Sequence, residues 1–227
     1  MDRNLFFYAT TMLLLLFLVF SFTHQQQNTI DVQGISQMDT EPDQAIITLA
    51  YENIATTASE AQQQNEQVIL KVKNALLNYV DEQDIETTGF SVYEYKEWDD
   101  DSYVSKGYKA MHNLKITLDN LNMVGTIIST STSNGINRIS GISYELSDEK
   151  MKQAKLDAYD SAMQNARSKA EKIADASNVR LGKVVYVTET SSFTPIYRAL
   201  SASVDEEAYS PEDITVSVSL NTKFKIN

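Results

Sequence analysis

The residues that first suggest chemistry form an acidic cluster beside the only tryptophan of the chain. Asp99, Asp100 and Asp101 directly follow Trp98 in the stretch EYKEWDDDSYVSKGY, residues 94–108. Consecutive side chains of a strand point to opposite faces, so three adjacent carboxylates are poorly placed to bind one ion. Calcium loops instead space their ligands at alternate positions, with a glycine and a distal glutamate. We therefore predict a solvated acidic turn at a hairpin tip and no metal site.

Side chains that commonly perform catalysis are scarce. The chain has no cysteine, which excludes disulfides, thiolate metal sites and cysteine nucleophiles. Its two histidines are His24, beside the apolar amino-terminal stretch, and His112, which we expect to be packed and hydrogen-bonded within a strand. No G-x-S-x-G, H-E-x-x-H or G-x-x-x-x-G-K motif is present. We expect no catalytic, cofactor-binding or metal-binding residues and no cofactor, which favours a protein that is not an enzyme without excluding one.

Two further regions carry side chains suited to a ligand or partner. Aromatic residues flank the acidic cluster and could stack a ligand, although cross-strand pairing explains most of them; they are Tyr93, Tyr95, Trp98, Tyr103 and Tyr108. The second region is a long irregular stretch rich in serine and glutamate, residues 191–213. It holds apolar groups from which a monomer gains little, namely Phe193, Ile196, Tyr197 and Leu200.

The bulk composition excludes some partners. The 227 residues carry a formal net charge of −12. An acidic surface repels phosphate backbones, and no cluster of Lys or Arg offsets this charge, so we expect no nucleic-acid binding. The hydrophobic content of 42% is ordinary for a globular protein.

The amino terminus has the composition of a membrane segment. LFFYATTMLLLLFLVFSF, residues 5–22, carries no charge and would span about 27 Å as a helix, close to the thickness of a hydrocarbon core. Arg3 precedes this run and no Lys or Arg follows until Lys71, which predicts a cytoplasmic amino terminus and an extracytoplasmic carboxyl-terminal part. We expect a single-pass anchor with its tether over 1–28 and an outer domain over 29–227. The alternative is export after signal cleavage, for which Ser21-x-Thr23 is a weak site.

Hydrophobic periodicity divides the outer part into strands and helices. A helix is expected from about Thr57 to Val80, with the S/T-x-x-E spacing of a capping box at Thr57 and Glu60. A shorter helix, capped by Asp119, should end at Asn134-Gly135, and an alanine-rich helix should occupy 148–176. Alternating stretches predict strands at 30–38, 45–52, 85–98, 108–118, 139–146, 183–190 and 214–226.

These elements define a fold class. Strands outnumber helices, and hairpins dominate over βαβ repeats. We therefore predict an α+β fold with a largely antiparallel sheet built from hairpins, on which two long helices and one shorter helix pack. The first two strands should pair with each other across the TEPDQ turn, residues 40–44.

Several stretches resemble one known family, the SIMPL-domain proteins of bacterial envelopes. The resemblance covers about residues 30–227 in order, and it is carried by EPDQAIITLAYE, DIETTGFSVYEY, GYKAMHNLKITL, NRISGISYELSD, AKLDAYDSAMQNARSKAEKIA, LGKVV and SPEDITVSVSL. It implies export to the envelope, a link to oxidative-stress defence and oligomeric assembly. It implies no shared catalytic centre.

Two functional hypotheses remain open. The first is a membrane-tethered, non-enzymatic envelope protein that self-associates or binds other proteins. The alternative is a binding protein or hydrolase for a small envelope ligand, using carboxylates near the 94–108 hairpin or the 191–213 loop. A concave pocket with two or more converging carboxylates would favour the second hypothesis, and unpaired sheet edges would favour the first.

Overall fold

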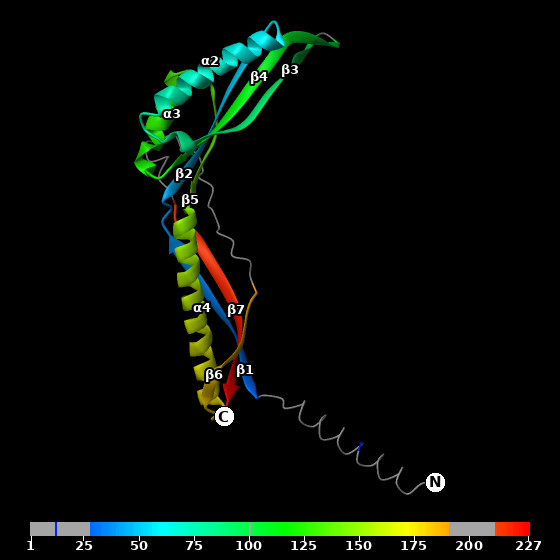
Figure 1. Cartoon of the computed structure of the whole chain (residues 1–227). Helices are drawn as coiled ribbons and strands as arrows, with labels where there is room; N and C mark the ends of the chain where they lie inside the picture. Colours follow the sequence, from blue (N-terminus) through cyan, green and yellow to red (C-terminus); the bar gives the residue numbers. More distant parts are fainter. Residues whose placement is uncertain (1–11, 13–27, 100, 191–211) are drawn as a thin grey trace, which may run out of the picture. The chain divides into compact units, whose positions relative to one another are not determined.

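The computed structural model describes residue 12 and residues 28–99, 101–190 and 212–227 (Figure 1). The predicted α+β class and the mainly antiparallel pairing are confirmed. The elements in chain order are β1 (Thr29–Thr40), β2 (Gln44–Ala55), α2 (Ala58–Leu76), η1 (Glu82–Asp84), β3 (Ile85–Asp99), β4 (Ser102–Leu118), η2 (Leu121–Met123), α3 (Val124–Ser133), β5 (Arg138–Glu145), α4 (Asp148–Ala176), β6 (Leu181–Glu189) and β7 (Ile214–Ile226).

The predicted membrane anchor lies outside the described residues, apart from Met12. Within the described ranges no helix combines the length and the apolar character needed to cross a membrane. The division at residues 28 and 29 stays a prediction.

The described chain forms two compact units. Among the described residues from 28 onward, unit 1 comprises 28–36, 159–190 and 218–227, and unit 2 comprises 37–99, 101–158 and 212–217, so the division falls within β1, α4 and β7. The strands form two sheets, one with the order β1-β7-β6 and one with the order β3-β4-β2-β5.

Unit 2 is built around the four-stranded sheet. Helices α2 and α3 cover one face of this sheet and close an apolar core between the two layers (Figure 1). Ile47 and Leu49 from β2, Val72 from α2 and Leu114 from β4 lie fully buried in this core. The capping box that the sequence predicts at the start of α2 is present, with Thr57 and Glu60 each accepting a backbone N–H of the other at 3.2 Å.

The prediction that the first two strands form a hairpin is wrong. β2 pairs with β4 on one side and with β5 on the other, while β1 joins β7 in the other sheet. The turn after β1 serves a different purpose, because the Asp43 carboxylate accepts hydrogen bonds from the Ser147 backbone N–H at 2.8 Å and from the Ser147 hydroxyl at 2.7 Å. Burial opposes the charge of Asp43, but the bonds from Ser147 outweigh it and hold the pKa of Asp43 below its usual value. Asp43 thus fixes the residue that caps α4.

Unit 1 depends on the small side chains of α4. Ala162, Ala166 and Ala170 are fully buried, and a Cβ atom on Gly34 of β1 would overlap the carbonyl oxygen of Ala162. Strand and helix backbones therefore approach closely, as the alanine spacing of the sequence predicts. Phe224 of β7 fills the space beside them and is also fully buried.

We expect Ala162→Leu to destabilise the protein by about 1–3 kcal/mol, because the added carbons overpack a site where two backbones nearly touch. The measurement is urea denaturation, with Ser168→Leu on the exposed side of the same helix as the control. Equal denaturation midpoints for the two variants would contradict the close packing.

Candidate functional site

The β3–β4 hairpin carries the acidic cluster that the sequence singles out. The strands stay paired as far as Asp99 and Ser102, and Asp101 takes the left-handed conformation with a φ of 91°. The predicted hairpin tip is therefore confirmed, and it is tighter than expected because β4 begins at Ser102 instead of Tyr108. The hydrophobic pattern does not predict the extra strand length, because the described residues from Trp98 to Lys106 are exposed on both faces. Asp100 is outside the described residues.

A bulge sets the direction of the hairpin. The β3–β4 register shifts between Tyr95 and Lys96, opposite Gly107, which has a φ of 111°. A Cβ atom on Gly107 would overlap the carbonyl oxygen of Ala55, so only glycine fits this point. Bulges increase the local strand twist and change the direction of the bulged strand, so this one orients the tip of the hairpin.

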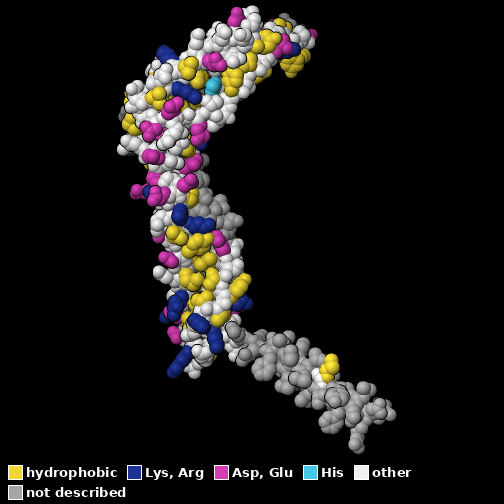
Figure 2. Space-filling view, viewed as in Figure 1, with side chains coloured by type: hydrophobic (Ala, Val, Ile, Leu, Met, Phe, Trp, Pro, Cys, Tyr) yellow, Lys and Arg dark blue, Asp and Glu magenta, His cyan; other side chains and the backbone are white. Residues whose placement is uncertain are grey.

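Two aromatic residues form the end of the hairpin. Trp98 and Tyr103 are cross-strand partners whose rings meet edge to face, with centroids 5.0 Å apart. This pair shows the expected cross-strand packing, but Tyr93, Tyr95 and Tyr108 lie opposite Lys109, Gly107 and Glu94, so the expectation that such pairing explains most of the five aromatics is wrong. Of the pair itself, 63% of Trp98 and 70% of Tyr103 remain exposed. The space-filling view shows hydrophobic side chains at this end of β3 and β4 (Figure 2).

The aspartates beside this pair do not form a described metal site. Asp99 lies 3.4 Å from the Lys106 ammonium, so a cation of the chain already faces it. In the described part of the chain no three His, Cys, Asp or Glu side chains are grouped to hold a metal ion, and Asp100 falls outside that part. The absence of a metal site stays a prediction.

His112 is a packed residue of β4. One ring nitrogen, Nε2, lies 3.1 Å from the Thr87 hydroxyl, and the ring lies 5.4 Å from that of Phe90. Burial, followed by the nearby charge of Lys73, lowers the pKa of His112. The neutral ring fits the structural role that the sequence suggests. His24 and residues 191–211 of the predicted loop lie outside the described residues.

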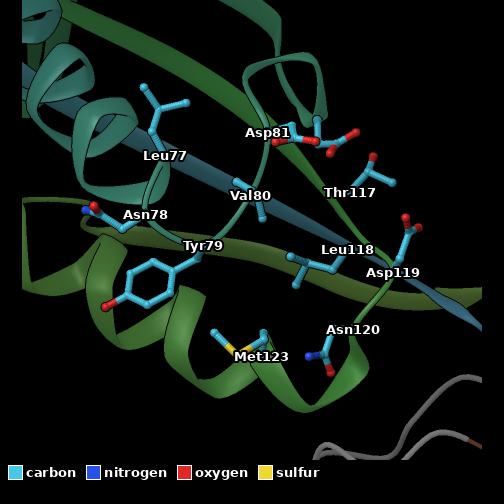
Figure 3. Close-up of a pocket in the computed structure, with 11 residues that line it drawn as sticks. Leu77, Asn78, Tyr79, Val80, Asp81, Thr117, Leu118, Asp119, Asn120 and Met123 are labelled. Carbon is cyan, nitrogen blue, oxygen red and sulfur yellow. The ribbon is translucent and has the colours of Figure 1, made fainter.

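Unit 2 contains a concave pocket of about 420 Å³ that the sequence patterns do not predict (Figure 3). It is formed by the end of α2, the turn before β3, the end of β4 and η2. Its lining residues are Leu77, Asn78, Tyr79, Val80, Asp81, Asp84, Thr117, Leu118, Asp119, Asn120 and Met123. In Figure 3 the Val80 and Leu118 side chains lie in the middle, with Asp81 and Asp119 toward one side and Tyr79 toward the other.

Three carboxylates make this pocket electronegative. Burial raises the pKa of Asp84, and the charges of Asp81 and Asp119 raise it further. Asp119 also accepts a hydrogen bond from the Gln44 amide at 3.1 Å. An apolar middle beside such a rim suits a ligand that has a cationic group on a short apolar stem.

Sequence patterns assign these aspartates to helix ends, which explains why the pocket is not predicted from the sequence. The DEQD stretch marks the end of a helix, and Asp119 looks like a helix cap. In the structure Asn120 caps η2 instead, because its side chain accepts the Asn122 backbone N–H at 3.2 Å, and α3 begins after Met123 without a side-chain cap. Asp119 and Asp84 approach each other only through the pairing of β3 with β4.

We expect Asp84→Asn to raise the free energy of unfolding at pH 7. A folded-state pKa above the unfolded value means that the ionised carboxylate costs stability as pH rises through that folded pKa. The gain should disappear below about pH 4, where the wild-type carboxyl is protonated in both states. Urea denaturation at pH 3 and pH 7 measures it, with Glu82→Gln as the control outside the pocket. Destabilisation by Asp84→Asn at pH 7 would show that the carboxylate has a stabilising partner.

Comparisons with known proteins place the sequence in a family. The model of the SIMPL family, described as proteins of unknown function (DUF541), matches residues 30–224. The 26 kDa periplasmic immunogenic protein of Brucella melitensis is 30% identical over 195 residues, which cover 81% of this chain and 77% of that protein.

Two similar relatives share the name uncharacterized protein YggE. The one from Edwardsiella ictaluri is 30% identical over 71% of this chain and 68% of its own length. The one from Escherichia coli is 26% identical over 73% of this chain and 68% of its own length. The family match spans both described units, and with these relatives it confirms the resemblance: the chain belongs to the SIMPL family.

Proposed function

We propose that the chain is an extracytoplasmic envelope protein that binds other proteins, including further copies of itself, and performs no catalysis. The name of the Brucella relative, a periplasmic protein, supports a location outside the cytoplasm. Tethering by residues 5–22 is part of this proposal, with cleavage after export as its alternative. The link to stress defence rests on the family resemblance alone and belongs to the same proposal.

One observation carries the proposal, namely the exposed Trp98–Tyr103 pair at the hairpin tip. Large aromatic side chains gain about 1.5–3 kcal/mol each when they are buried. Trp and Tyr are also enriched among residues that dominate binding energy at protein interfaces. In a monomer the two rings contact each other but leave most of their surface in water, whereas a partner surface would bury them together.

The sheet edges add a second argument. In the described strands, β3 and β5 are the edges of one sheet and β1 and β6 are the edges of the other. Edge strands present unpaired backbone groups that favour pairing with another chain. On β6, Val185, Tyr186 and Val187 are each at least 39% exposed, which makes this edge apolar as well.

A second candidate function is the binding of a small cationic ligand in the pocket around Asp84. The observation that favours it is the concave shape with three carboxylates and an apolar middle. The expected carboxylates near the 94–108 hairpin and the 191–213 loop are not the ones that line this pocket.

Membrane tethering predicts that the protein sediments with membranes and retains residues 5–22. Cell fractionation followed by amino-terminal sequencing measures both properties. A soluble species that begins near Gln25 would show that the segment is a cleaved signal.

Self-association predicts that Trp98→Ala/Tyr103→Ala lowers the average molar mass of residues 29–227. Light scattering at micromolar concentration measures it, and moderate salt should strengthen assembly of the wild type by screening repulsion over about 8–10 Å. The control is Leu70→Ala, an exposed apolar residue of α2 that lies on neither the hairpin nor a sheet edge. A wild-type monomer at every salt concentration would contradict assembly, and an unchanged oligomer of the double variant would contradict the choice of the hairpin.

A further inference from the structure

Charge is distributed unevenly between the two units. The described part of unit 1 carries seven Lys or Arg residues against five Asp or Glu residues. The described part of unit 2 carries ten Lys or Arg residues against twenty-one Asp or Glu residues. The acidic balance that argues against anionic partners therefore belongs to unit 2, and unit 1 has to be considered separately.

The cations of unit 1 gather where its chain segments end. Lys172 lies near the end of α4, Arg180 and Lys183 lie at the start of β6, and Lys225 lies near the end of β7. Arg180 and Asn227 exchange backbone hydrogen bonds of 3.2 and 3.1 Å, which places the start of β6 beside the carboxyl terminus. Figure 2 shows Lys and Arg side chains gathered at this end of unit 1, near the terminus marked C in Figure 1.

These four side chains, which we call the basic end, have no acidic partner in the described structure. All four are exposed, and none belongs to an ion pair within the described ranges. The acidic side chains beside them on α4 are Glu171 and Asp175, and Glu171 is already paired with Arg167 at 3.1 Å, so cations exceed anions. The next cation along β7, Lys223, is by contrast paired with Asp31 at 3.0 Å.

The amino-terminal chain reaches the fold at this same end. Ile226 directly follows Lys225, and its backbone N–H donates to the carbonyl oxygen of Asn28 at 3.1 Å. Only residues 23–27 separate Asn28 from the apolar run that ends at Phe22. Fully extended, this connection spans about 20 Å. A membrane that holds residues 5–22 therefore lies within about 20 Å of Asn28.

We propose that the basic end docks on the anionic phospholipid headgroups of the membrane that holds the anchor. This inference rests on the membrane tethering proposed above. Clustered Lys and Arg residues beside a membrane segment are attracted to anionic lipid, and the attraction decays within a Debye length of about 8–10 Å. Docking would give unit 1 a preferred orientation on the membrane.

The experiment uses the full chain in vesicles of phosphatidylcholine alone or with added phosphatidylglycerol. Brief acetylation of lysine amines, read by mass spectrometry, reports which ammonium groups are covered. We expect Lys172, Lys183 and Lys225 to react about fivefold more slowly with the anionic lipid, the ratio that corresponds to about 1 kcal/mol per cation. Lys71 and Lys152, exposed in unit 2, should react equally in both vesicles, and high salt should abolish the protection.

Variants separate docking from other causes of protection. Lys183→Glu/Lys225→Glu should remove the protection of Lys172, whereas Lys71→Glu/Lys152→Glu should leave it unchanged. Equal labelling in both vesicle types, for a chain that floats with the vesicles, would overturn the docking while tethering stands. A chain that floats with neither vesicle type would overturn the tethering, and the docking with it. Protection that appears in phosphatidylcholine as protein concentration rises would assign the basic end to a second copy and also overturn the proposal.

Discussion

The pairing of β2 on both sides is the constraint from which the architecture of unit 2 follows. Its inward side chains, including Ile47 and Leu49, are fully buried beneath α2, and its two edges are occupied by β4 and β5. With both edges occupied, β2 has no edge left for β1, which joins β7 instead. The same arrangement places β3 at the edge of the sheet, and β2 ends at Ala55 opposite Tyr108. The end of the β3–β4 hairpin therefore has no other described strand beside it. The exposed Trp98–Tyr103 pair is a consequence of this topology.

Features that depend on local chemistry were predictable from the sequence. The bounds of α4 follow from its alanine period and from Ser147, and the capping box at Thr57 and Glu60 gives the start of α2. Both signals involve neighbours within one or a few helical turns. The turn at Pro42 and Asp43 misled the prediction because the side chain that suggests a hairpin turn binds Ser147, 104 residues away. A hydrogen bond between residues so far apart depends on how the whole core packs, and the hydrophobic periodicity of the sequence does not reveal it.

The candidate sites divide in the same way. The hairpin was predictable because its two strands are adjacent in the chain. The pocket was not, because Asp84 and Asp119 are brought together only by the antiparallel register in which Ile85 faces Ile116. The basic end could not be predicted from the net charge of the whole chain, which is −12. The described residues of unit 1 nevertheless carry more cations than anions. Charge counted per unit recovers the basic end, but the units are known only from the fold.

The central claim is that the aromatic tip of the hairpin is a binding surface, and the chain provides its own probe. Trp98 is the only tryptophan, so fluorescence of the unmodified protein that is excited where tryptophan but not tyrosine absorbs reports on this tip alone. Emission recorded over a dilution series, beside the molar mass of the same samples, tests the claim directly. We expect the emission to shift toward the blue as molar mass rises, because assembly removes the ring from water. Emission that stays that of a water-exposed tryptophan while molar mass rises would show that assembly uses another surface.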